Sequence, residues 1–132
     1  MNINAKIVSK EKIKSRKGFT GADWWFDENG DLQVRVEQLA SYGRTMALML
    51  HEIAEAVLCK QHGVSVAAVD KFDLEFEEAN PTNHGIEAGD AVGCPYGREH
   101  NLATAVERIV AGGLGMGVCD SWSEYDKDLA EK

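Results

Sequence analysis

The segment MALMLHEIAEAVLC, residues 46–59, constrains the fold of this chain more than any other. Eleven of its fourteen residues are apolar, and the three polar ones, His51, Glu52 and Glu55, lie together in the middle. Ser41 is a suitable N-cap and Gly63 a suitable residue to stop a helix, so one long helix is expected from about residue 41 to residue 62. Because removing a carboxylate from water is costly unless it is paired or coordinated, the sequence predicts a partner for these groups.

Shorter patterns around this helix predict an α+β fold. Residues 22–38 indicate a β-hairpin, since three aromatic residues precede a turn and apolar residues then alternate with polar ones. Residues 3–8 could add another strand, and Ser65 can cap a helix over residues 66–79. A third helix is expected from about Glu99 to Leu114, presenting the apolar residues Leu102, Val106, Ile109 and Val110. We therefore expect a small antiparallel sheet packed on about three helices.

Length and composition predict a single domain over residues 1–132, with 44% hydrophobic residues available for one core. Residues 1–20 form a basic segment with six Lys or Arg against one Glu, and residues 119–132 form an acidic tail. The chain beyond residue 20 carries a net charge of −13, which makes a nucleic-acid partner unlikely because phosphate contacts depend on Lys and Arg. No run approaches the roughly 20 apolar residues of a membrane span, and no secretory signal is recognisable. We expect a cytoplasmic protein without a membrane partner, and no feature indicates an oligomeric state.

The polar residues of the long helix have the spacing of metal ligands. Residues four apart lie on one helix face, so His51 and Glu55 can direct their side chains at one point. This is the zinc-binding HExxH motif with glutamate in place of the second histidine. A catalytic zinc usually takes three protein ligands and keeps one position for water, and we favour His100 as the third. Glu52 would then be the general base that accepts a proton from the activated water.

Other polar residues have weaker claims to a role at this site. Glu107 lies seven residues beyond His100 and could accept a hydrogen bond from a ligand histidine or bind the metal itself. His84 lies in a loop and could reach a metal, although such histidines are more often solvated. His62 at the helix end is explained by the helix dipole. Asp73 and Asp90 could orient a ligand histidine, although capping or solvent exposure is commoner.

A family resemblance adds to this interpretation. The runs LHEIAEAVLCKQHGV, DKFDLEFE and AGDAVGCPYGREHNLATAVERIVAGGLG resemble small phage and prophage proteins in which an HExxE helix precedes a Pro-Tyr-x-x-x-His segment. The similarity covers roughly residues 22–125, and HEIAE and PYGREH are its most specific parts. These proteins resemble zincin metallopeptidases. The resemblance implies a minimal zincin-like domain, a strand beside the metal helix that aligns a peptide or protein substrate, and the host cytoplasm as location. A glutamate ligand also suits manganese or iron in place of zinc.

The expected function is therefore hydrolysis of a peptide or amide bond by metal-activated water, and two alternatives stay open. One is an all-α, magnesium-dependent nucleotide pyrophosphohydrolase, in which Glu52 and Glu55 form one acidic pair and Glu75 and Glu78 a second. His51 and the Trp-rich hairpin would have no role in such an enzyme. The other is a non-enzymatic acidic phage protein that binds a host component and carries a structural metal.

Overall fold

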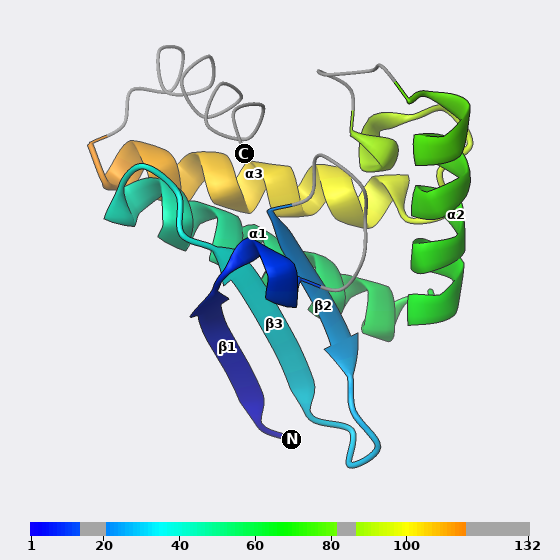
Figure 1. Ribbon diagram of the computed structural model, residues 1–132, viewed down its shortest axis with the longest axis horizontal. Coiled ribbons are helices and arrows are strands. Elements are labelled where there is room, and N and C mark those ends of the chain that lie inside the picture. The colour runs from blue at the N-terminus through cyan, green and yellow to red at the C-terminus, as the bar shows by residue number, and fades with distance from the viewer. Residues whose placement is uncertain (14–20, 82–86, 116–132) are drawn as a thin grey trace.

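The computed structural model describes residues 1–13, 21–81 and 87–115. The chain forms, in order, β1 (Ile3–Val8), the short 3-10 helix η1 (Lys10–Lys12), β2 (Ala22–Phe26), β3 (Leu32–Glu37), α1 (Tyr42–Gln61), α2 (Val66–Ala79), the 3-10 helix η2 (Ala88–Asp90) and α3 (Gly97–Gly113). Helix α1 packs on β2 and β3 and also on α3, while α2 stands across one end of the helix pair (Figure 1). The predicted α+β fold is confirmed.

The sheet has the strand order β1–β3–β2. Strands β2 and β3 form the predicted antiparallel hairpin, in which Trp24 lies opposite Val34. The carboxylate of Asp27 closes the turn by accepting hydrogen bonds from the backbone N–H groups of Asn29 and Asp31. Strand β1 pairs with β3 in parallel, with Ala5 opposite Val34. The expected antiparallel sheet is therefore wrong in one respect: the sheet is mixed, because β1 runs parallel to β3.

The core lies between the sheet and α1. Alternate residues of the central strand β3, Leu32, Val34 and Val36, are fully buried, as the two-residue period of a strand requires. They pack in one cluster with Met49 and Cys59 of α1. Each large apolar side chain removed from water in this way stabilises the fold by about 1.5–3 kcal/mol. Helix α1 is therefore fixed firmly against the sheet.

The ends of α1 and α2 are set by local chemistry, as the sequence predicts. The Ser41 hydroxyl accepts a hydrogen bond from the N–H of Arg44, and the Ser65 hydroxyl accepts one from Ala68. Gly63 follows α1 with a φ of 75°, a conformation that glycine adopts readily. These caps fix where α1 ends, and therefore the direction in which α2 leaves it.

Helix α3 turns an unexpected face toward α1. Its buried residues are Glu99, His100, Ala103, Glu107 and Ala111. The apolar residues that the sequence presents, Leu102, Val106 and Ile109, are exposed, and Ile109 keeps 75% of its accessible surface. Two buried alanines allow α3 to approach α1 closely, while His100 and Glu107 meet polar partners on α1. The contact between α1 and α3 is therefore largely a polar one.

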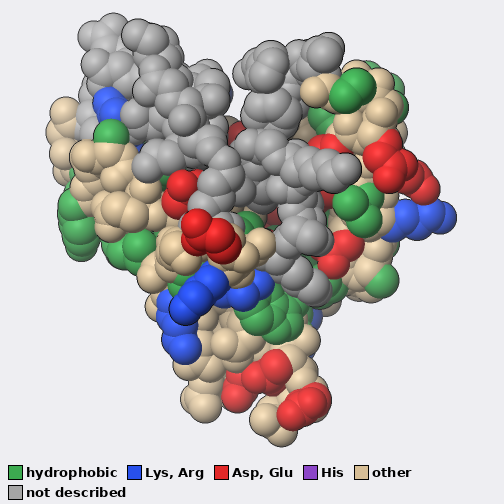
Figure 2. Space-filling model, viewed as in Figure 1, with side chains coloured by type: hydrophobic (Ala, Val, Ile, Leu, Met, Phe, Trp, Pro, Cys, Tyr) green, Lys and Arg blue, Asp and Glu red, His purple; other side chains and the backbone are tan. Residues whose placement is uncertain are grey.

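Acidic and basic side chains lie in separate patches on the face that Figure 2 shows. Asp and Glu side chains gather over α2 and over the turn of the hairpin, and Lys and Arg side chains lie over the sheet. None of the described helices is both long and apolar enough to span a membrane. Cys59 and Cys94 are free thiols. Most of the basic segment's second half, the acidic tail and His84 lie outside the described residues.

Candidate metal centre

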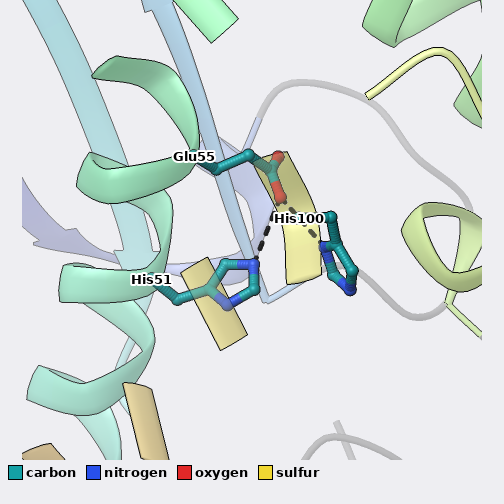
Figure 3. A group of neighbouring side chains, drawn as sticks. All are labelled: His51, Glu55 and His100. Atoms are coloured by element: carbon teal, nitrogen blue, oxygen red, sulfur yellow. Dashed lines mark hydrogen bonds and ion pairs between the residues drawn. The ribbon is translucent and has the colours of Figure 1, made fainter. Parts of the chain in front are cut away.

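Three side chains predicted as metal ligands meet between α1 and α3. His51 and Glu55 lie one turn apart on α1, and His100 projects from the first turn of α3 (Figure 3). The Nε2 atom of His51 is 3.2 Å from Oε2 of Glu55, and Nδ1 of His100 is 3.0 Å from the same oxygen. All three residues are buried, with 4–6% of their surface exposed. The structure thus brings together two segments that are 45 residues apart.

The spacing of these three atoms fits a small divalent cation. In a tetrahedral zinc site with bonds of about 2.0–2.1 Å, neighbouring ligand atoms lie about 3.3 Å apart. Two of the three separations between these atoms, 3.2 and 3.0 Å, are close to that value. His51, Glu55 and His100 therefore form a group that could hold a metal ion. The donor set of two imidazoles and one carboxylate is one that catalytic zinc sites use.

A buried carboxylate holds the far side of His51. The Oε1 atom of Glu107 on α3 is 2.7 Å from Nδ1 of His51, and the side chains of both residues are almost fully buried. The second oxygen of Glu107 has no hydrogen-bond partner within the described part of the chain. Metal-binding histidines commonly donate their other ring N–H to a carboxylate, which fixes the ring. Glu107 lies at the distance of such an acceptor, which is one of the two roles that the sequence suggested for it.

The carboxylate of Glu55 is held at both oxygens. Its Oε2 atom faces the two histidines, and its Oε1 atom accepts a hydrogen bond of 3.1 Å from the indole N–H of Trp24. Trp24 belongs to β2, so the sheet orients Glu55 directly. The sequence analysis missed this role, because the two residues are 31 positions apart and no local pattern links them.

His51, Glu55 and His100, called the cluster below, influence one another's protonation. Burial alone would lower the pKa of His100, but hydrogen bonds with Glu55 and Glu87 raise it to about 10. Burial would raise the pKa of Glu55, but hydrogen bonds from His100 and His51 lower it to about 2. Without a cation, protonated imidazoles therefore balance the buried carboxylates. A cation at this position would replace those protons, because metal-bound histidine must be unprotonated.

Glu52, the predicted general base, lies beside this group and is not a member of it. Its side chain is half-buried on α1, one residue beyond His51. Burial lowers the pKa of His51, and hydrogen bonds with Glu107 and Glu55 raise it well above its ordinary value. The charge of Glu52 raises the pKa of His51 further.

Other residues considered from the sequence have different partners. The Nδ1 atom of His62 is 2.8 Å from Oε1 of Glu99, which links the end of α1 to the start of α3. Asp73 accepts a hydrogen bond from the hydroxyl of Tyr96. Asp90 does approach His100, in the position from which the sequence analysis suggested that it could orient a histidine.

The all-α fold of the pyrophosphohydrolase alternative is wrong, because Ala22–Phe26 and Leu32–Glu37 form two strands of a sheet. Its second acidic pair, Glu75 and Glu78, is exposed on α2. Among the described residues, neither glutamate belongs to a group that could hold a cation.

Comparisons with protein-family models, with curated proteins and with solved structures found no match to this chain. The resemblance to zincin-like phage proteins therefore stays a prediction. The function proposed below rests on His51, Glu55 and His100.

Proposed function

We propose that this protein is a metal-dependent hydrolase that cleaves a peptide or amide bond, with His51, Glu55 and His100 holding a zinc ion. The observation that carries the proposal is the convergence of Nε2, Oε2 and Nδ1 of these residues, at cation-binding distances and shielded from solvent. A carboxylate ligand also makes manganese or iron acceptable in the same position. When bound, such a cation lowers the pKa of a water molecule toward neutrality and polarises a carbonyl group.

The residues of the chain have distinct tasks in this reaction. Glu52 accepts a proton from the attacking water and later delivers it to the leaving amine. Glu107 and Trp24 keep His51 and Glu55 in their orientations through the contacts described above. In the sheet of the described residues β2 is an edge strand, and its Trp24 contacts Glu55. An extended peptide that pairs with β2 would therefore lie close to the cluster.

A metal-binding experiment tests the first half of the proposal. Purified wild type, His51→Ala, His100→Ala and His62→Ala would be loaded with zinc, desalted and analysed for bound metal. We expect about one zinc per wild-type chain and per His62→Ala chain, since His62 contacts Glu99 outside the cluster. Both cluster variants should lose most of the metal. If all four proteins were equally metal-free, the metal hydrolase proposal would be rejected.

A second experiment separates catalysis from binding. The zinc-loaded wild type and Glu52→Gln would be incubated with a mixed peptide library, and cleavage would be followed by mass spectrometry. We expect Glu52→Gln to keep its zinc and to cleave about 10²–10⁴ times more slowly, the usual contribution of a general base. A hydroxamate should inhibit the wild type by occupying the open position of the metal. Zinc binding without cleavage of any library peptide would favour the non-enzymatic alternative with a structural metal.

A further inference from the structure

The ring of His100 is contacted at both of its nitrogens. While Nδ1 faces Glu55, the Nε2 atom is 3.0 Å from Oε2 of Glu87 and 3.3 Å from Oδ1 of Asp90. Glu87 immediately precedes the short helix η2 and Asp90 is its last residue, and their side chains are 54% and 53% exposed. The ring is therefore held between a buried carboxylate and two carboxylates at the surface.

Gly89, between these two acids, touches the face of the same ring. A Cβ atom added at Gly89 would lie 2.3 Å from Cγ of His100 and 2.5 Å from its Nδ1, far inside van der Waals contact. Gly89 does not have a positive φ, so its backbone conformation would accept any residue. Glycine is required there by the close approach of the ring. Helix η2 thus fixes the position of the ring by contact and its rotation by hydrogen bonding.

We propose that residues 87–90 position His100 as a metal ligand, with Gly89 against the face of its ring and two carboxylates at its Nε2 atom. A neutral imidazole has one N–H donor and one acceptor nitrogen, and the partner of the donor decides which nitrogen is which. Glu87 and Asp90 can only accept, as can Glu55 at Nδ1. When a cation takes the place of the proton on Nδ1, Glu87 and Asp90 accept the remaining Nε2–H. The lone pair of Nδ1 then points toward His51 and Glu55, where a cation would bind. This inference rests on the proposed metal site, and it makes Glu87, Gly89 and Asp90 positioning residues.

The test compares zinc affinities, measured by competition with a chromophoric chelator. The variants are Glu87→Ala/Asp90→Ala, Glu87→Gln/Asp90→Asn and Gly89→Ala. Removing both acceptors should weaken zinc binding about 10–100-fold, the usual effect of losing such contacts. The amide variant should recover most of the affinity, because an amide oxygen also accepts the Nε2–H. Gly89→Ala should weaken binding at least as much as the double alanine variant.

Two matched controls separate positioning from general damage. Gly113→Ala changes a glycine of α3 whose added Cβ would meet nothing within 4 Å. Glu75→Ala/Glu78→Ala removes two exposed carboxylates of α2. Both should bind zinc within about twofold of wild type, since substitutions remote from the site change little. Nitrogen-15 NMR of the zinc-loaded wild type should show His100 protonated at Nε2, and this proton should exchange faster with water in the double alanine variant, which has no carboxylate to accept it.

Each result has a separate meaning. A wild type that binds no zinc overturns the proposed function and this inference together. A wild type that binds zinc, with the double alanine and Gly89→Ala variants within twofold of it, overturns only the positioning role. Failure of the amide variant to recover affinity overturns it too, because charge would then be the cause. Two zinc ions per wild-type chain, falling to one in the double alanine variant, would overturn the positioning role and show that Glu87 and Asp90 belong to a second cation site.

Discussion

At the residue scale, the cluster depends on the protonation of its histidines. The folded-state pKa of His100 is raised from 6.5 to about 10, so its stabilising contribution is complete below pH 6.5 and is lost as the pH rises through 10. The pKa of Glu55 is lowered from 4.5 to about 2, so its contribution is complete above pH 4.5 and is lost as the pH falls toward 2. The metal-free cluster therefore stabilises the fold most between pH 4.5 and pH 6.5.

Protons and zinc should consequently compete for the same atoms. We expect the unfolding free energy of the metal-free protein to decline from pH 6.5 to pH 10, while its zinc affinity rises over the same interval. Urea denaturation in the presence of a chelator measures the first quantity, and chelator competition at each pH measures the second. His100→Gln should flatten the decline in stability. A wild type whose metal-free stability did not change over this interval would contradict the ion pairing described here.

At the scale of elements, the polar contact between α1 and α3 predicts which substitutions α3 tolerates. Ala103 is fully buried against α1, whereas Ile109 is largely exposed. Ala103→Leu should destabilise the protein by about 1–3 kcal/mol through overpacking. Ile109→Lys should change stability by no more than about 0.5 kcal/mol. Urea unfolding followed by circular dichroism measures the stability of both variants. A larger loss of stability in Ile109→Lys than in Ala103→Leu would mean that the apolar face of α3 is the buried one.

The same helix shows where sequence analysis succeeds and where it does not. The caps at Ser41 and Ser65 and the turn at Gly63 depend on neighbours within four residues, so their positions could be predicted. The buried face of α3 depends on what α1 offers, and apolar periodicity alone indicated the wrong face. The parallel pairing of β1 with β3 is also non-local, and nothing in either strand specifies it.

The candidate site follows the same rule. The i, i+4 spacing of His51 and Glu55 is local, and it was sufficient to suggest a metal. The choice of His100 depended on two segments meeting, and the structure brings them together. Trp24 and Glu87 could not be anticipated, because their contacts with the cluster depend on tertiary packing. Residues that contact a metal-binding side chain are therefore harder to predict from sequence than the metal-binding residues themselves.

At the scale of the whole molecule, a cation in the cluster should stabilise the fold. A ligand that binds only the folded state raises the unfolding free energy by about 2.7 kcal/mol at a hundredfold excess over its dissociation constant. Zinc should therefore raise the thermal midpoint of the wild type, a chelator should reverse the change, and His51→Ala should show neither effect. Scanning calorimetry with and without zinc measures all three. An equal rise in His51→Ala would indicate binding outside the cluster.

The long separation between Glu55 and His100 also affects the order in which the protein can assemble. Their contact closes a loop of 45 residues, and the entropy lost on closure delays such contacts relative to short-range ones. The β2–β3 hairpin and α1 can form from consecutive segments, whereas α3 must return across that loop. We expect pulsed hydrogen exchange to find amide protection in α3 later than in α1. A chain still emerging from the ribosome would then have His51 and Glu55 in place well before His100 arrives.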